Sequence, residues 1–208
     1  FQNLNHSYIS KCKKIICCDI SSTDIIRHIL KDKPNIIFHL AANAYVPYSF
    51  EHPLEVNEAN VVGTLNILEA ARQLKNLDRI ICTSSSEVYG TAKSKNLKES
   101  DPISAQSPYA ATKIAADQLS LSYYKSFNLP VKIRRPVNTF GPRQSLRAVI
   151  PTIVSQFIKN KKTIIRVGNL KATRDFLYVE DLCSAYEKVL KSKKLFGEVV
   201  NVGSNFEV

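Results

Sequence analysis

Short apolar runs alternate with longer helical patterns along most of this chain. The strand-like runs lie at residues 15–18, 36–42, 79–83, 131–135 and 197–202. Helical patterns lie between several of them, at residues 21–30, 53–74 and 108–127. The runs at 15–18 and 36–42 are consistent with buried strands, and strands that alternate with helices form parallel sheets. The chain is therefore expected to fold as an α/β protein with a doubly wound parallel sheet.

The helical patterns carry signals of their own. Val61, Leu65 and Leu68 form an apolar stripe at helical spacing, and Pro108 suits the first turn of the helix at 108–127. After residue 142 the rhythm changes, and we expect a helix at 150–158, an extended segment at 163–167 and a helix at 180–190. These later elements predict a smaller region joined to the sheet.

The composition bounds the class of protein. With 208 residues, 44% of them hydrophobic, the chain is long enough for one domain with a sizeable core. No apolar run reaches the roughly 18 residues of a membrane span, and the first residues lack the pattern of a signal peptide. The five cysteines show no Cys-x-x-Cys spacing, so neither a metal site nor a disulfide framework is predicted. Cys17 and Cys82 fall in strand-like runs as small hydrophobes, and a reducing, cytoplasmic location is expected.

A polar stretch follows directly on one apolar run. Residues 83–90 read Thr-Ser-Ser-Ser-Glu-Val-Tyr-Gly, which places Ser85, Ser86 and Glu87 just after the strand at 79–83. Open α/β sheets bind their ligands at the carboxyl ends of strands. Tyr109 and Lys113 are four residues apart, which on a helix places both on one face. An ammonium beside a phenol lowers its pKa from about 10, so Tyr109 is expected to accept a proton from a substrate hydroxyl.

Together these two motifs resemble the extended short-chain dehydrogenases and reductases, in particular the NAD-dependent epimerases and dehydratases of nucleotide sugars. Further segments match that family in order: His39-Leu40-Ala41-Ala42, Asn60-Val61-Val62-Gly63-Thr64, residues 135–143 and Arg174-Asp175-Phe176. The resemblance runs from about Ile15 to the end of the chain. It implies a Rossmann-like sheet, NAD as cofactor, a nucleotide-diphosphate sugar as substrate, and a homodimer joined through helices that include residues 109–127.

The matched positions carry family roles onto residues of this chain. The resemblance implies that NAD is bound by Asp19, Ile20, Leu40, Ala41, Ala42, Ala44, Tyr109, Lys113 and Thr139. It implies that the sugar nucleotide is bound by Ser85, Asn138, Val149 and Arg174, where the arginine fork suits a diphosphate. His39 is expected to be a core histidine and Asn60 a structural residue, while Tyr45 departs from the commoner His of the family.

The polar stretch also indicates the reaction class. Family dehydratases carry Glu at the position of Glu87, where epimerases usually have a small residue, and it removes the sugar C5 proton after C4 has been oxidised. Ser86 stands where glucose-type dehydratases have Asp and where mannose-type and N-acetylhexosamine-type dehydratases have Ser. We therefore predict a nucleotide-sugar 4,6-dehydratase that forms a 4-keto-6-deoxy sugar, with Ser85, Ser86, Glu87, Tyr109 and Lys113 as the catalytic set. Residues 144–151 most resemble the N-acetylglucosamine dehydratases of the legionaminate pathway.

Other interpretations of the same residues stay open. A 4-epimerase or a sugar-nucleotide decarboxylase of this family would share Tyr109, Lys113 and NAD, and decarboxylases can also carry Ser-Glu-Val-Tyr-Gly. From a different class, the chain is a non-catalytic fragment that binds only a sugar nucleotide or a protein partner.

The six glycines bear on the cofactor site. No two of them are spaced to form G-x-G-x-x-G or G-x-x-G-x-x-G, the turn that receives a dinucleotide pyrophosphate. We expect the chain to lack the first strand, that turn and a C-terminal part of such an enzyme. Residues 1–142 are then a partial NAD-binding domain without its glycine-rich first unit. Residues 143–208 are a partial substrate-binding region interleaved with the last elements of the sheet.

The net charge is +11, from 29 Lys and Arg against 18 Asp and Glu. The lysines are scattered and no aromatic residues are interleaved with them, which argues against nucleic-acid binding. A basic cleft that attracts a diphosphate-linked sugar is the favoured explanation.

Overall fold

The structure is a computed structural model that describes residues 11–92, 96–160, 164–168 and 171–208. Its strands are β1 (Ile36–His39), β2 (Arg79–Thr83), β3 (Val131–Pro136), β4 (Asn138–Phe140), β5 (Phe176–Tyr178) and β6 (Val199–Val202). Its helices are α1 (Asp24–Asp32), α2 (Val46–Glu51), α3 (Pro53–Asn57), α4 (Gly63–Gln73), α5 (Pro108–Phe127), α6 (Val149–Asn160) and α7 (Val179–Lys191). A π-helical turn, η2 (Glu58–Val62), joins α3 to α4, and a 3₁₀ turn, η3 (Ser86–Tyr89), follows β2.

The main sheet is parallel throughout, which confirms the predicted α/β fold. In the part of the chain that the structure describes, its strand order is β1-β2-β3-β6. Ile80 of β2 pairs with Ile37 of β1 on one side and with Val131 of β3 on the other, and Ile133 pairs with Val199 of β6. A second parallel pair, β4 with β5, continues from the carboxyl end of β3.

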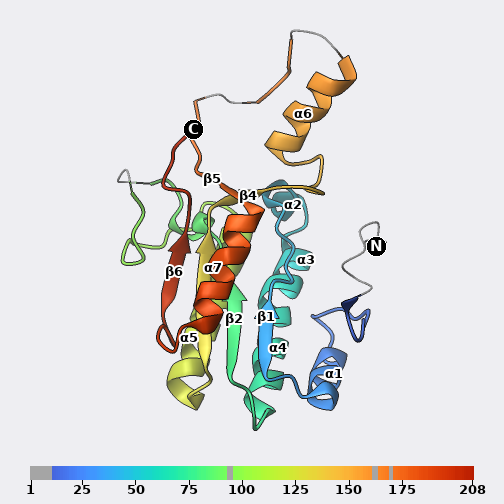
Figure 1. The fold of residues 1–208 in the computed structure, drawn as a ribbon, viewed down its shortest axis with the longest axis vertical. Coiled ribbons are helices and arrows are strands. Elements are labelled where there is room, and N and C mark those ends of the chain that lie inside the picture. The colour runs from blue at the N-terminus through green and yellow to red at the C-terminus, as the bar shows by residue number, and fades with distance from the viewer. Residues whose placement is uncertain (1–10, 93–95, 161–163, 169–170) are drawn as a thin grey trace.

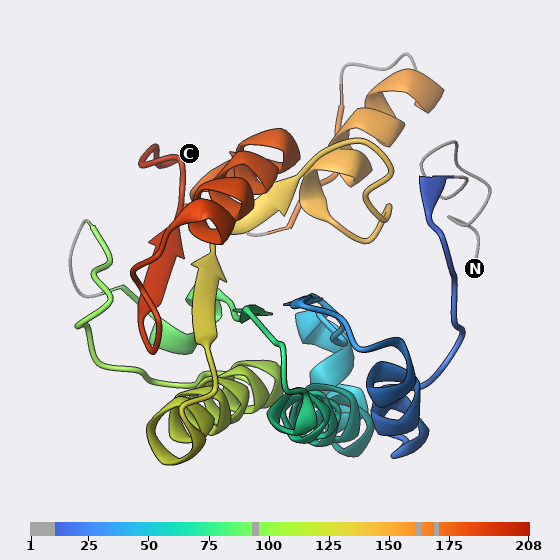
Figure 2. The same cartoon turned by 60° about the horizontal axis from the view of Figure 1, so that its bottom comes forward.

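Helices cover both faces of this sheet, as in a Rossmann-like fold. Figure 1 shows α7 in front of the strands and α4 and α5 behind them, and Figure 2 shows the same two layers from below. All four strands of the main sheet point toward the end where α2, β4 and β5 lie (Figure 1). Because ligands bind at the carboxyl ends of parallel strands, this end is where the site is expected.

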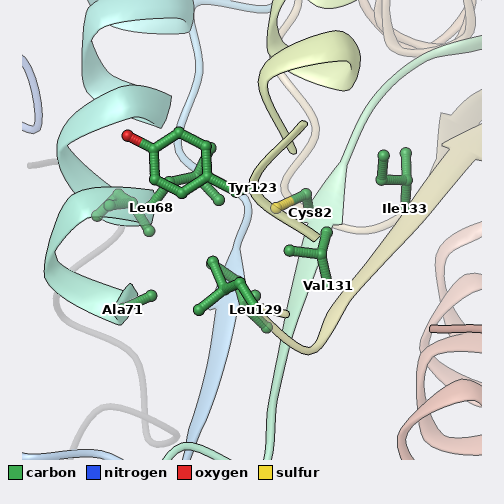
Figure 3. Close-up of a cluster of buried hydrophobic side chains, with 9 residues drawn as sticks. Leu68, Ala71, Cys82, Tyr123, Leu129, Val131 and Ile133 are labelled. Carbon is green, nitrogen blue, oxygen red and sulfur yellow. The ribbon is translucent and has the colours of Figure 1, made fainter. Parts of the chain in front are cut away.

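The core lies between the sheet and the helices α4 and α5. Figure 3 shows Leu68 of α4 and Tyr123 of α5 packed toward Cys82, Val131 and Ile133 on the strands. Leu68, Val131 and Ile133 have no exposed surface, and Cys82 is buried as predicted. Burying such side chains contributes about 1.5 to 3 kcal/mol each, so this cluster holds the helices against the sheet.

The strand predicted at residues 15–18 is absent, and that prediction is wrong for this structure. Residues 15–18 have no regular secondary structure, and Ile15, Ile16 and Cys17 are exposed. Within the described residues no neighbouring strand pairs with this run, and a strand without a neighbour has no partners for its backbone groups. Ile36 and Phe38 of β1 are likewise 38% and 41% exposed, because β1 is the edge strand of the described sheet.

Most of the other boundaries agree with the sequence patterns, although the strand predicted at 36–42 ends at His39 and the strand predicted at 197–202 begins at Val199. The helix predicted at 108–127 is α5 without any shift, with Ser107 capping its amino end through the backbone N–H of Ala110 and Asn128 ending it at a φ of 53°. The pattern at 53–74 becomes α3, η2 and α4 in succession. Residue 163 of the segment expected to be extended lies outside the described residues, and residues 164–167 form no strand.

Lys132 is fully buried on β3, a position that the sequence analysis did not foresee for a lysine. Its ammonium donates to the carbonyl oxygens of Val189 (2.9 Å) and Ser192 (2.6 Å) and lies 4.4 Å from the ring centroid of Phe196. These carbonyls belong to the end of α7, where a positive charge complements the helix dipole. The lysine thus satisfies groups that an apolar residue would leave unpaired.

We predict that Gly197→Ala destabilises the fold. Gly197 has a φ of +71°, and a Cβ there would lie 2.1 Å from Cε1 of Tyr124, a residue packed against the core. We expect the free energy of unfolding to fall by about 2 kcal/mol or more, measured by urea denaturation. Gly168→Ala is the matched control, because a Cβ at Gly168 meets nothing within 4 Å. Equal stability of the two variants would contradict this prediction.

Candidate functional site

The polar turn after β2 is held in one conformation by its own hydrogen bonds. Ser85 caps η3, and its Oγ accepts a hydrogen bond from the backbone N–H of Glu87 at 3.2 Å. The turn ends at Gly90, whose φ is +66° and whose Cβ position lies 2.4 Å from the carbonyl oxygen of Ser104. Only a glycine fits this closely packed backbone, so the side chain of Glu87 leaves the sheet edge from a fixed position.

Tyr109 and Lys113 meet this turn from the first turns of α5. The Ser85 hydroxyl and the Glu87 carboxylate both lie close enough to the phenol of Tyr109 to act on its pKa. Tyr109 and Lys113 are 5% and 6% exposed, whereas Ser85 and Glu87 are half-buried. The structure therefore brings a phenol, a serine hydroxyl and a carboxylate together at the carboxyl end of β2.

The electrostatics of Tyr109 differ from the expectation drawn from spacing. Burial raises the pKa of the Tyr109 phenol, the Ser85 hydrogen bond opposes this rise, and the charges of Glu87 and Asp117 add to it. The Nζ of Lys113 donates to the carbonyl oxygen of Thr83 at 2.9 Å. The prediction that Lys113 lowers the pKa of Tyr109 is wrong for this structure, because the ammonium is directed to the backbone of β2.

Lys113 itself lies in a poorly hydrated position. Burial lowers the pKa of its ammonium below the ordinary value, and the negative charge of Asp117 acts in the opposite direction. Its hydrogen bond to Thr83 is a contact with a neutral carbonyl. The charge on Lys113 consequently depends on its anionic neighbour on the same helix face, one turn further along α5.

A groove of about 510 Å³ lies beside the carboxyl end of β1. It is lined by Cys18, Asp19, Ile20, Ala41, Ala42, Asn43, Ala44, Tyr45 and Ala59. Five of these residues were predicted from the sequence to bind NAD, namely Asp19, Ile20, Ala41, Ala42 and Ala44. The alanines leave room for a ligand to approach the backbone, whereas Leu40, also predicted, is 58% exposed and is not part of the lining.

The acidic side of the groove suits the adenosine part of a dinucleotide. The Asp19 carboxylate accepts hydrogen bonds from the backbone N–H and the hydroxyl of Ser21, both at 2.9 Å. These bonds lower the pKa of Asp19, so that a negative charge stands next to the apolar side chain of Ile20. A carboxylate acceptor beside an apolar surface fits a ribose hydroxyl or an adenine amino group, and the residues present therefore fit NAD.

Two buried asparagines hold the groove in shape. Asn60 donates to the carbonyl oxygen of Asn43 (3.1 Å) and to Thr112 of α5 (2.9 Å), and it accepts from the N–H of Asn43 (2.7 Å). Asn66 donates to the carbonyl oxygens of Ile20 (2.9 Å) and Ser21 (3.0 Å). The structural role predicted for Asn60 is confirmed. Asn66 escaped the sequence analysis, although a polar residue within an apolar helix stripe was the signal that could have found it.

The remaining predicted binding residues lie on the elements above the sheet. Asn138 and Thr139 belong to β4, and Val149 begins α6 with 49% of its surface exposed. Arg174 is exposed on the segment before β5, and its NH1 donates to the carbonyl oxygen of Thr173. The elements β4, β5 and α6 lie at the carboxyl end of β2 (Figure 1), but none of these four residues belongs to the groove lining.

The neighbour of Arg174 is engaged elsewhere. Asp175 accepts hydrogen bonds from the N–H and hydroxyl of Ser204 and from the N–H of Asn205. The carboxylate of Asp175 therefore holds the turn after β6.

The described part of the chain has neither a group of metal-binding side chains nor a membrane-spanning helix. Among those residues no three His, Cys, Asp or Glu side chains are grouped so as to hold a metal ion. No helix there is long and apolar enough to cross a membrane.

Comparison with known proteins places the fold and the site in context. The family model described as GDP-mannose 4,6 dehydratase matches residues 1–208. The dTDP-D-glucose 4,6-dehydratase of Homo sapiens is 36% identical over 196 residues, which cover 94% of this chain and 55% of the human protein. The chain spans about half the length of the curated relatives it matches.

Solved structures of nucleotide-sugar dehydratases and epimerases have a similar fold. A dTDP-glucose 4,6-dehydratase from Bacillus anthracis in complex with NAD has a TM-score of 0.85 and 31% identity, covering 99% of this chain and 64% of its own. A UDP-glucuronic acid 4-epimerase from Bacillus cereus in complex with UDP-glucuronic acid and NAD has a TM-score of 0.87 and 28% identity, covering 97% and 64%. These structural homologues bind NAD, and one of them binds a nucleotide sugar.

We predict that His39 makes the stability of the fold depend on pH. His39 is 7% exposed and its Nε2 is hydrogen-bonded to Thr64 Oγ1 at 2.9 Å, as expected of a core histidine. Burial first, and then the charge of Lys113, lowers its pKa from 6.5 to about 4. Between these values the unfolded chain binds more protons, so stability falls as the pH is lowered from 6.5 to about 4, by about 3 kcal/mol in all.

The comparison of wild type with His39→Gln isolates this contribution from that of the carboxylates. Urea unfolding at about pH 7 and about pH 4 should show a difference between the two proteins that shrinks at the lower pH. A difference that stays constant would mean that His39 does not titrate in this interval.

Proposed function

The chain belongs to the GDP-mannose 4,6-dehydratase family of NAD-dependent epimerases and dehydratases, and we propose that it supplies the active site of a nucleotide-sugar 4,6-dehydratase. The observation that carries the proposal is that η3, which holds Glu87, packs at the carboxyl end of β2 against α5, whose first turn holds Tyr109. A phenolate and a carboxylate at one site can take a proton from the C4 hydroxyl and a proton from the neighbouring carbon C5 of the same hexose.

The residues of the turn then have distinct tasks. Tyr109 takes the proton of the sugar C4 hydroxyl, and Ser85, which lies close to the phenol, orients the same oxygen. Glu87 removes the C5 proton, which is acidic once C4 is a ketone, and passes it to the C6 hydroxyl, which leaves as water. Ser86 adjoins Glu87 in η3, and a serine there favours mannose-type or N-acetylhexosamine-type substrates, including the N-acetylglucosamine type suggested by residues 144–151.

The cofactor assignment rests on the groove. Asp19, Ile20, Ala41, Ala42 and Ala44 would hold the adenosine part of NAD, while Tyr109, Lys113 and Thr139 would lie toward its nicotinamide end. The chemistry that bound NAD supplies is the removal of hydride from sugar C4 and its return to C6. Because burial raises the pKa of Tyr109, the phenol holds its proton in this structure, and the site must lower that pKa when it is complete.

The substrate diphosphate is assigned to the elements above the sheet. Arg174 is exposed there, so its guanidinium can turn toward a phosphate and grip it with two parallel hydrogen bonds. Asn138 and Val149 lie on β4 and at the start of α6, where they can contact the diphosphate and the nucleotide base. We also propose a homodimer, with α5 at the interface.

The test of the dehydratase proposal is Glu87→Gln in the enzyme that carries this chain. Loss of the carboxylate should lower the rate of water loss by about 100-fold or more. Transfer of hydride to NAD should remain detectable by the absorbance of the reduced cofactor. Glu187→Gln is the matched control, because Glu187 is exposed on α7 and faces Lys191. Unchanged dehydration in Glu87→Gln would reject the assignment.

A second candidate function is 4-epimerisation, which is favoured by the similarity to the UDP-glucuronic acid 4-epimerase. Product mass distinguishes the candidates, because epimerisation leaves the mass unchanged, dehydration removes water and decarboxylation removes carbon dioxide. Assays with dTDP-glucose, GDP-mannose and UDP-N-acetylglucosamine would identify the sugar class.

We further predict that these 208 residues on their own bind NAD weakly or not at all. None of the six glycines is spaced to form the turn that receives the pyrophosphate, so the groove would contribute adenosine contacts alone. Equilibrium titration measures the affinity. A dissociation constant in the micromolar range would contradict the prediction. It would also exclude the alternative that the chain binds only a sugar nucleotide or a protein partner.

A further inference from the structure

A buried ion pair joins α5 to β3 beside the proposed catalytic residues. Asp117 follows Lys113 by one turn of α5 and is 2% exposed. Its Oδ2 accepts a hydrogen bond from Nε of Arg135 on β3 at 2.9 Å, and the two side chains are 3% and 5% exposed. Removing both charges from water is costly, so this pair requires more explanation than a surface contact.

The pair extends to the turn that carries Glu87. NH1 of Arg135 donates to the hydroxyl of Tyr89 at 2.8 Å, and its guanidinium lies 5.0 Å from the centroid of the Tyr89 ring. The Tyr89 hydroxyl in turn donates to Oδ1 of Asn201 on β6 at 2.8 Å. Because Tyr89 is the last residue of η3, a continuous chain of buried contacts joins α5, β3, β6 and the polar turn.

Asp117 also faces the amine of Lys113. The negative charge of Asp117 favours the ammonium form, against the effect of burial. The other groups that act on Lys113 and Asp117 come from the neighbouring elements, namely His39 on β1, Cys82 on β2, Ser84 in the turn, Tyr109 on α5 and Arg135 on β3. None of these five groups is a carboxylate, so Asp117 is the carboxylate that acts on both Lys113 and Arg135.

We propose that Asp117 is a positioning residue with two effects on the site: it keeps Lys113 charged and in place, and through Arg135 it fixes Tyr89 and hence the turn that presents Glu87. The proposal rests on the proposed function only for its catalytic consequences. The state of Lys113 can be measured whichever reaction the enzyme performs, so the failure of one proposal does not imply the failure of the other.

The first experiment compares wild type, Asp117→Asn and Asp117→Glu in the enzyme that carries this chain. NMR of lysine labelled at Nζ and Cε follows the titration of Lys113. We expect its midpoint to fall by about one pH unit or more in Asp117→Asn, because a neutral amide no longer offsets burial. The high-pH limb of kcat for hydride transfer should move down with it. Asp117→Glu should restore both, and Asp181→Asn, a change at an exposed carboxylate on α7, should alter neither.

Asp117→Asn leaves the charge of Arg135 buried without a counter-ion and can prevent folding. The double variant Asp117→Asn with Arg135→Gln removes both buried charges, so it is expected to fold. Lys113 loses its anionic neighbour in the single and in the double variant, and its titration can be measured in the one that folds. A Lys113 midpoint that is unchanged in both variants would overturn the first effect.

Tyr89→Phe tests the second effect separately. It removes the hydroxyl that joins Arg135 to Asn201 while leaving Asp117 beside Lys113. We expect the rate of water loss to fall by about tenfold with KM within about threefold, and no movement of the high-pH limb. A shift of that limb, or a rate equal to that of wild type, would overturn the assignment of the Arg135–Tyr89 contact to the placement of Glu87.

Discussion

The register between β2 and β3 is the constraint on which the rest of the structure depends. The ladder continues one residue past β2, where the N–H of Ser84 donates to the carbonyl oxygen of Arg134 at 2.6 Å. This bond fixes where the strand ends and the polar turn begins. The carbonyl of Thr83 is left to accept from Lys113, and Arg135 is brought level with α5. A slip of one residue would exchange the two faces of β3 and separate these groups.

Much of the fold could be predicted because its signals are local. The helix at 108–127 has a serine cap, a proline in its first turn and an asparagine at its end, and each of these acts through its own backbone. The run at 15–18 shows the limit of such reasoning, since its composition suits a strand but cannot reveal whether another strand lies beside it. Lys132 is a second case, because only the tertiary structure brings the end of α7 over β3.

The candidate site follows the same division. The spacing of Tyr109 and Lys113 was enough to predict that they share one face of α5. Five of the residues predicted to bind the cofactor line the groove. The direction of the Tyr109 pKa was missed, because it depends on how deeply the phenol is buried and on where the Lys113 amine finds an acceptor. The resemblance to a family indicates which residues form the site, here Tyr109 and Lys113. It does not indicate their charge states, because these depend on how the side chains are packed.

The π-helical turn η2 holds one residue more per turn than the helices on either side of it. Deleting a single residue there would let α3 run into α4 as an ordinary α-helix, and the residues beyond would keep nearly their present angle because the extra residue is taken up within one turn. The contacts of Asn66 with Ile20 and of Thr64 with His39 would therefore survive. The loss would fall on the groove itself, because η2 carries Ala59, which lines it, and Asn60, which holds Asn43.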